Sequence, residues 1–297
     1  MSVKICSLFD SPVLKALGEA QNLNICKISY KTFPDGESYL RFEEDITGDH
    51  LILIDSLNTP NPKLLPMVFF AETARKLGAS QVGLIAPYLA YMRQDIAFNP
   101  GESVTSVYYA ELISRYFDWL VTVDPHLHRY RSLSEIYSIK SKVVSATQAV
   151  ADWIKTNISN AILIGPDSES EQWVSKIAEI ASVPYVILKK ERLGDRDVEI
   201  TFDRGLNSQG KTPVLVDDII STATTMVETI KQLKKINITA PVCIGVHAVF
   251  SEDAYESLIH AGAQKIVTCN TIAHHSNQID ITNTLIKPYL EIVHSKA

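Results

Sequence analysis

The stretch Val214-Leu215-Val216-Asp217-Asp218-Ile219-Ile220-Ser221-Thr222-Ala223-Thr224-Thr225 decides the fold of this chain. It starts with an apolar run that does not alternate with polar residues, which is typical of a strand covered on both faces. Two carboxylates and several small or hydroxyl-bearing residues follow, before an amphipathic stretch. A buried strand that leads through a short polar loop into a helix predicts a parallel α/β architecture.

The same alternation of short apolar runs and longer amphipathic stretches occurs along the whole chain. It predicts an α/β fold of mainly parallel sheets flanked by helices and joined by right-handed crossovers. We expect strands at Val3–Phe9, Leu51–Asp55, Val82–Ala86, Trp119–Asp124, Ala161–Gly165, Tyr185–Leu188, Val214–Asp217, Val242–Val249 and Lys265–Cys269. We expect helices at Pro62–Leu77, Ser103–Phe117, Thr147–Lys155, Glu171–Ala181 and Thr225–Lys235.

The chain has 297 residues, enough for two domains at ~150 residues each. No linker divides it, so the pattern places an N-terminal domain at residues 1–145 and a C-terminal domain at 146–297. The pattern also allows the last segment to pack on the first domain. Two pairs of stretches hint at duplication, although their offsets differ. Leu84–Pro87 resembles Leu163–Pro166, and Val121–Asp124 resembles Leu215–Asp218.

The composition narrows the class of protein. Hydrophobic residues make up 46% and charged residues 21%, as in an ordinary globular chain. The 28 basic and 34 acidic residues give a net charge of −6, which argues against a nucleic-acid partner or an anionic membrane surface. The cysteines form no disulfide framework or metal-ligand spacing, and neither a signal peptide nor a membrane-spanning stretch is indicated. These features favour a cytoplasmic protein.

The loop at Ser221 to Thr225 has the chemistry of a phosphate site. Backbone N–H groups at a helix start attract phosphate, and hydroxyl groups add donors. Carboxylates do not bind phosphate directly, so Asp217 and Asp218 suit sugar hydroxyls or a Mg²⁺ ion. The alternative interpretation is an ordinary strand end followed by helix capping.

This segment resembles the phosphoribosyl diphosphate motif of type I phosphoribosyltransferases and of ribose-phosphate diphosphokinases. Three further stretches resemble diphosphokinase motifs in the right order: Phe33-Pro34-Asp35-Gly36-Glu37, Tyr91-Met92-Arg93-Gln94-Asp95 and Val123-Asp124-Pro125-His126-Leu127-His128. The resemblance spans essentially the whole chain. It implies two similar phosphoribosyltransferase-type domains and the transfer of the diphosphoryl group of ATP to the 1-hydroxyl of ribose 5-phosphate.

The resemblance assigns a role to each motif. It places Phe33, Asp35, Glu37, Arg93, Gln94, Asp95 and His126 in the ATP site, and links His126 and Asp167 to a Mg²⁺ cofactor. It places Asp217, Asp218, Ser221, Thr222, Ala223, Thr224 and Thr225 in the ribose 5-phosphate site. The segment Lys189–Arg196 resembles the family's catalytic loop, with Lys190 and Arg192 as the catalytic cations. It further implies a homo-oligomer, a dimer or larger.

The sequence departs from the common family pattern at two places. Ser168 to Trp173 replaces a glycine-rich continuation, and Thr224 stands where glycine is most frequent. Glycine permits backbone conformations and close phosphate approach that threonine resists. Ser221 and the Pro-His-x-His motif resemble the archaeal-type branch.

Two alternatives stay open at this point. A phosphoribosyltransferase that consumes phosphoribosyl diphosphate would share the Asp217–Asp218 loop but would not need an ATP site. An inactive, regulatory relative of the diphosphokinases would bind ribose 5-phosphate without releasing AMP.

Overall fold

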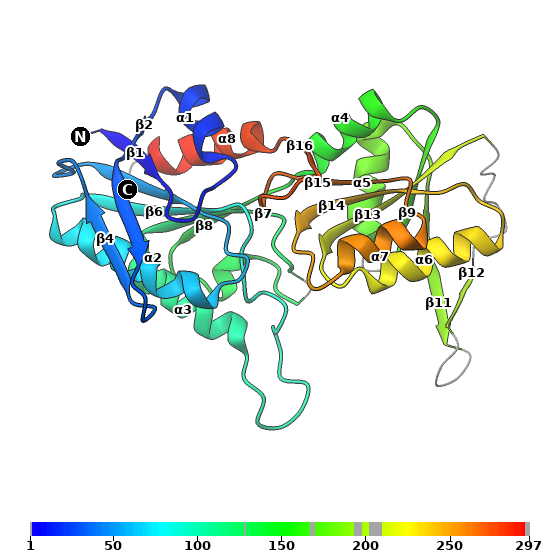
Figure 1. Cartoon of the computed structure of the whole chain (residues 1–297), viewed down its shortest axis with the longest axis horizontal. Helices are drawn as coiled ribbons and strands as arrows, with labels where there is room; N and C mark the ends of the chain where they lie inside the picture. The colour runs from blue at the N-terminus through cyan, green and yellow to red at the C-terminus, as the bar shows by residue number, and fades with distance from the viewer. Residues whose placement is uncertain (1, 128, 167–169, 193–197, 202–209, 295–297) are drawn as a thin grey trace. The chain divides into compact units, whose positions relative to one another are not determined.

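The computed structural model describes residues 2–127, 129–166, 170–192, 198–201 and 210–294 (Figure 1). The chain forms two compact units, one of Met1–Ser145 with Ile281–Ala297 and one of Ala146–Asp280. No helix among the described residues is long and apolar enough to cross a membrane. The four cysteines are buried free thiols.

The first unit is built on a six-stranded parallel sheet. Its order is β2 (Asn24–Ile25), β1 (Val3–Cys6), β5 (His50–Ile54), β6 (Gln81–Ala86), β7 (Trp119–Val123) and β8 (Lys140–Val144). In Figure 1, helices α1 (Leu14–Gln21) and α8 (Thr282–His294) lie on one side of this sheet, and α2 (Asn61–Lys76) and α3 (Thr105–Tyr116) on the other. A short 3₁₀ helix spans Leu133–Glu135.

The second unit repeats this arrangement. Its parallel sheet has the order β10 (Tyr185–Ile187), β9 (Ala161–Gly165), β13 (Thr212–Ile220), β14 (Val242–Ala248), β15 (Lys265–Cys269) and β16 (Asn277–Ile279). Helix α4 (Thr147–Asn157) packs against α5 (Glu171–Ala181), and α6 (Thr224–Lys235) packs against α7 (Ala254–Ala261). The predicted fold class, with two units of this type, is confirmed.

Each unit also carries a two-stranded antiparallel ribbon after its second strand. In the first unit the ribbon pairs β3 (Ile28–Thr32) with β4 (Ser38–Phe42). In the second it pairs β11 (Lys189–Arg192) with β12 (Val198–Thr201). The first half of the segment expected to be a catalytic loop is therefore a strand, because its backbone pairs with β12.

Fully buried strands form the centre of each core. Trp119 is buried in β7, beside Gly83 of the neighbouring β6. A β-carbon at Gly83 would lie 2.0 Å from the Trp119 ring. Glycine is therefore required at this register position, since any side chain would displace the indole from the core.

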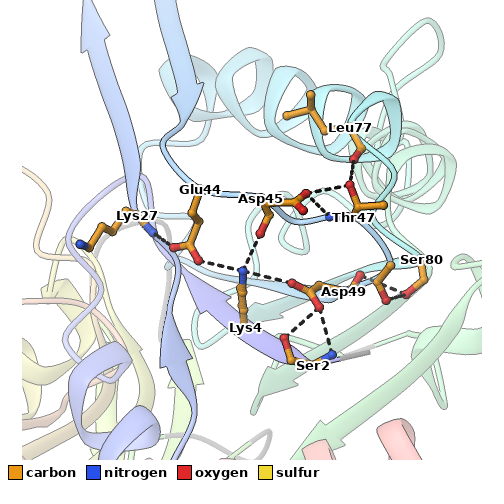
Figure 2. A network of polar contacts seen from close by, with 10 residues as sticks. Ser2, Lys4, Lys27, Glu44, Asp45, Thr47, Asp49, Leu77 and Ser80 are labelled. Carbon is orange, nitrogen blue, oxygen red and sulfur yellow. Dashed lines mark hydrogen bonds and ion pairs between the residues drawn. The ribbon is translucent and has the colours of Figure 1, made fainter.

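A polar network fixes the start of β1 in the first unit (Figure 2). The Lys4 ammonium donates to Glu44 Oε2 and to the Asp45 carbonyl, each at 2.7 Å, and lies 3.1 Å from Asp49 Oδ2. Asp49 Oδ1 also accepts from the Ser2 N–H at 3.0 Å. The segment that precedes β5 is thereby tied to the first strand.

Candidate functional site

Backbone strain marks the loops that follow the parallel strands. Tyr91, Asp124 and Ala223 have left-handed φ values of 60°, 31° and 58°. They follow β6, β7 and β13, at the edge of each sheet where ligands bind in folds of this type. Non-glycine residues with positive φ are uncommon and concentrate at functional sites. Three of the four predicted motif regions thus carry such a residue.

The Phe33–Glu37 motif is the turn of the β3–β4 ribbon. The Phe33 N–H donates to the Glu37 carbonyl at 2.7 Å, and Gly36, with a φ of 93°, closes the turn. The Phe33 ring is 42% exposed and contacts the edge of Tyr39, and the Lys31 ammonium lies 5.4 Å from its centre. The turn therefore presents an aromatic ring, whose face can stack on a base, beside the exposed carboxylates of Asp35 and Glu37.

The loop after β6 and the loop after β7 are joined by two residues that the sequence did not reveal. Arg129 Nη1 donates to Asp95 Oδ1 at 2.7 Å. The Tyr130 hydroxyl donates to the Asp95 carbonyl at 3.2 Å and lies 3.3 Å from Ser106 Oγ. These contacts unite two motifs that were predicted separately, and no sequence spacing signals them.

The other predicted ATP-site residues lie on the same two loops. Arg93 is exposed, and His126 is half-buried after β7. Gln94 Oε1 accepts from Thr105 Oγ1 at 3.1 Å at the start of α3, so this side chain holds the loop to the helix. Asp95 is buried, and its carboxylate is engaged by Arg129. The described contact of this carboxylate is thus with the protein's own arginine.

The second unit presents the predicted phosphate loop. Strand β13 runs to Ile220, three residues beyond the expected end, because its pairing with β14 continues to Ala248. Asp217 and Asp218 therefore lie within the strand, and both are half-buried. Asp217 Oδ1 accepts the Asp218 N–H at 3.0 Å, and Asp218 Oδ1 accepts the Ile219 N–H at 2.8 Å. The side-chain oxygens are thus held close to the strand by backbone donors.

The loop itself connects Ile220 to α6. Ala223 is the residue before the helix, and the first N–H groups of α6, from Thr224 onward, have no partner within the helix. Ser221 and Thr225 are half-buried, whereas Thr222 and Thr224 are exposed, with their hydroxyls 3.1 Å apart. The backbone N–H groups and the hydroxyls therefore lie together, where they can donate hydrogen bonds to a phosphate.

The segment after β14, which the sequence did not indicate, supports this loop. The Phe250 N–H donates to the Ile220 carbonyl at 2.8 Å, and the Ser251 N–H donates to the Ser221 carbonyl at 3.1 Å. The two serine hydroxyls are 3.3 Å apart. The position of Ser221 thus depends on contacts made across the sheet edge.

Three predicted residues lie wholly or partly outside the described residues. Lys190 and Arg192 lie on β11, where their backbones pair with Ile200 and Val198. Their side chains fall outside the described part of the structure, as does the whole of Asp167.

The oxygen ligands that suit a divalent cation are present, but they do not form a ready cage. Within the residues that the structure describes, no group of three or more His, Cys, Asp or Glu side chains is arranged to hold a metal ion. Asp217 and Asp218 offer two adjacent carboxylates, and Mg²⁺ is commonly held by one or two carboxylates with waters and substrate phosphates. The donor set fits a cation that arrives with its substrate.

Comparison with known proteins covers almost the whole chain. The family model for the N-terminal domain of ribose phosphate pyrophosphokinase matches residues 3–116, and that for the phosphoribosyl transferase domain matches residues 132–281. The ribose-phosphate pyrophosphokinase of Sulfolobus acidocaldarius is 32% identical over 262 residues, covering 87% of this chain and 89% of that protein. That of Methanopyrus kandleri is 30% identical, covering 90% of this chain and 91% of that protein.

The fold comparison agrees. The crystal structure of phosphoribosylpyrophosphate synthetase from Mycobacterium smegmatis matches with a TM-score of 0.85 at 18% identity, and each chain is covered completely.

Proposed function

The chain belongs to the ribose-phosphate pyrophosphokinase family, and we propose that its two sets of loops carry out that family's reaction with Mg²⁺ as the metal ion. The enzyme transfers the diphosphoryl group of ATP to the 1-hydroxyl of ribose 5-phosphate, which gives phosphoribosyl diphosphate and AMP. One observation carries the assignment of the loops. A phosphate loop follows β13, while two motif loops joined by the Asp95–Arg129 ion pair follow β6 and β7.

Ribose 5-phosphate is assigned to the second unit. The N–H groups at the start of α6 and the hydroxyls of Ser221, Thr222, Thr224 and Thr225 bind its phosphate. Asp217 and Asp218 accept hydrogen bonds from the sugar hydroxyls, and Ala223 lets the backbone turn into the helix. Carboxylates fit this part of the substrate because hydroxyl groups donate, whereas phosphate oxygens only accept.

ATP is assigned to the loops of the first unit. Phe33 stacks on the adenine, and Asp35 and Glu37 accept from its amino group. Arg93 binds the phosphates as a planar, permanently charged donor. Gln94 and Asp95 hold the loop in place, and we assign His126 and Asp167 to the metal ion that would accompany the phosphates.

The chemical step forms a bond between the sugar's 1-oxygen and the β-phosphorus of ATP, and it breaks the bond from that phosphorus to the oxygen that leaves with AMP. Negative charge spreads over the non-bridging oxygens, so cations supply most of the catalysis. Lys190 and Arg192 are the cations that we assign to this charge. A bound Mg²⁺ would neutralise the phosphates and orient them.

The experiment is an assay of AMP release. Purified protein is incubated with ATP, ribose 5-phosphate and Mg²⁺, and AMP and phosphoribosyl diphosphate are expected in equal amounts. Formation of a nucleotide from phosphoribosyl diphosphate and a free base, without AMP release from ATP, would favour a phosphoribosyltransferase. Binding of ribose 5-phosphate without any AMP would favour an inactive regulatory relative.

We also propose a homo-oligomer, a dimer or larger. Neighbouring helices α2 and α3 expose apolar side chains four residues apart, namely Leu65 with Phe69 and Tyr108 with Leu112. Such a patch favours association. Light scattering measures the mass, and a monomer at assay concentrations would contradict the proposal.

A further inference from the structure

Arg129 is held in an unusual way beside the loop assigned to ATP. Its partner Asp95 has a side chain that is 2% exposed, whereas the Arg129 side chain is 47% exposed. The guanidinium also lies 5.3 Å from the centre of the Phe98 ring. One end of this ion pair is therefore fixed inside the protein, and the other reaches the surface.

The buried carboxylate of Asp95 requires the charge of Arg129, but it occupies only one of the N–H donors of the guanidinium. A buried carboxylate is costly unless a cation compensates it. A guanidinium has five N–H donors in a planar fork. Among the residues that the structure describes, Asp95 is the acceptor that pairs with this guanidinium, through the single donor Nη1. Most of the donors thus remain for another anionic group, and phosphate is the anion that matches the fork.

The position of the ion pair indicates which substrate supplies the phosphate that Arg129 binds. Asp95 closes the Tyr91–Asp95 motif, and Arg129 follows His126 by three residues on the next loop. We propose that Arg129 is a further residue that binds the phosphates of ATP, and that Asp95 is the positioning residue that holds it. This inference rests on the proposed function, because it assumes that these loops hold ATP.

The test uses four variants of the full chain. Arg129→Gln removes the charge, Arg129→Lys keeps the charge without the fork, and Asp95→Asn removes the anchor. Arg131→Gln is the matched control, because Arg131 is an exposed arginine two residues away whose backbone N–H donates to Glu135. For each variant, KM for ATP, KM for ribose 5-phosphate and kcat are measured by AMP release. The affinity for Mg-ATP alone is measured by calorimetry.

We expect Arg129→Gln to weaken ATP binding by about 10- to 100-fold, the effect of losing one charge-assisted contact. KM for ribose 5-phosphate should change by less than about 2-fold, since that substrate is assigned to the other unit. Arg129→Lys and Asp95→Asn should show smaller losses of the same kind, and Arg131→Gln should behave as the wild type.

Two results overturn the proposal. One is wild-type ATP affinity in Arg129→Gln. The other is an equal increase in both KM values together with a lower melting temperature, which would identify a purely structural ion pair. Wild-type protein that releases no AMP would overturn the proposed function alone, because calorimetry with Mg-ATP would still decide the role of Arg129.

Discussion

At the scale of single residues, Ala223 carries a conformation that alanine adopts at a cost. Its φ of 58° and ψ of 9° are left-handed, and Thr224 is the first residue of α6. Glycine at 224 was the family pattern that the sequence departs from, but the positive φ falls one residue earlier. Threonine at 224 therefore meets no conformational obstacle from a left-handed backbone.

This assignment predicts opposite outcomes for two substitutions. Ala223→Val should lower the free energy of unfolding by about 2 kcal/mol, because a β-branched side chain resists the left-handed region. Ala223→Gly should not lower it by more than about 0.5 kcal/mol, since relief of strain offsets the added chain entropy and the lost methyl burial. Urea unfolding measures both. Equal losses in the two variants would contradict the assigned strain.

Asp55 is a second residue whose environment has a measurable consequence. Its carboxylate is fully buried and accepts from Ser7 Oγ at 2.6 Å and from the N–H groups of Leu8 and Phe9 at 2.8 and 3.1 Å. Burial outweighs these bonds and the nearby Lys63 charge, and raises the pKa of Asp55 from 3.8 to about 6. The folded protein therefore holds the ionised form at a cost.

The sign of the pH dependence follows from this raised pKa. The contribution of Asp55 to stability is fully present below pH 3.8 and is lost as the pH rises through about 6. The loss amounts to roughly 3 kcal/mol. Asparagine does not titrate, so the unfolding free energy of wild type minus that of Asp55→Asn should fall between pH 4 and pH 7. A difference that stays constant over this range would contradict the raised pKa.

At the scale of elements, the Lys4 network decides whether β1 is fixed to the segment before β5. The pKa of Lys4 is raised chiefly by its hydrogen bond to Glu44. The pKa of Asp49 is lowered to about 2, first by the Ser2 N–H and further by Lys4. The pKa of Glu44 is lowered, first by its hydrogen bond from Lys4. The charged forms of Lys4, Glu44 and Asp49 are therefore all favoured in the folded state at neutral pH.

Lys4→Met should lower the free energy of unfolding by about 1.5–3 kcal/mol, because two carboxylates lose a charge-assisted partner. Lys15→Met is the matched control. Lys15 is 85% exposed and pairs with Glu19 at 3.9 Å, so its loss should cost less than about 0.5 kcal/mol. Urea unfolding at pH 7 compares the two. A loss in Lys4→Met no larger than in the control would mean that the network contributes no stability.

The elements that the sequence predicted well are those with a clear hydrophobic pattern. Strands β9 and β15 and helix α5 match their predicted bounds, because unbroken apolar runs or clear helical spacing fix them. The ribbon strands β3 and β4 were missed, since Phe42 is their one buried residue and they show no apolar run. The Lys-rich edge strand β8 was missed for the same reason. Their strand conformation comes from pairing with a neighbour rather than from burial.

The site was likewise predicted in part, because its motifs were found but the contacts between them were not. Motif spacing was enough to choose loops, but the ion pair between Asp95 and Arg129 joins positions 34 residues apart. The support of Ser221 by Ser251 joins positions 30 apart. Such contacts exist only once the parallel strands place their loops along one edge, so local sequence patterns do not encode them.

At the scale of the whole molecule, the topology establishes the duplication that the sequence only hinted at. The sheet order is the same in both units, so β1, β5 and β6 correspond to β9, β13 and β14. The earlier pairing of Leu84–Pro87 with Leu163–Pro166, and of Val121–Asp124 with Leu215–Asp218, matched strands that are not equivalent. By this correspondence the β3–β4 ribbon, with Phe33, is the counterpart of the β11–β12 ribbon, with Lys190 and Arg192.

The two units differ in the chemistry of equivalent loops. The loop before α2 corresponds to the phosphate loop before α6. Pro60 and Pro62 stand at the start of α2, and neither has a backbone N–H to donate to a phosphate. The Lys63 ammonium is already bonded to the Ser56 carbonyl at 2.7 Å and to Asn58 Oδ1 at 2.9 Å. Phosphate binding at a helix start is therefore expected in the second unit alone, although both units share the scaffold.

The net charge of −6 looks unsuited to substrates as anionic as ATP and ribose 5-phosphate. The net charge is nevertheless compatible with these substrates, because the acidic residues of the site are not assigned to bare phosphate. We assign amino groups, sugar hydroxyls and a cation to Asp35, Glu37, Asp217 and Asp218. Few cations are then left to offset the phosphates, so a divalent ion must contribute.

Excess chelator should reduce AMP release by at least about 100-fold, the scale of losing one main electrostatic stabiliser, and added Mg²⁺ should restore it. The melting temperature without substrates should not change in chelator, since the described residues form no metal cluster that would hold the fold. AMP release that persists in excess chelator would contradict the assigned division of charges.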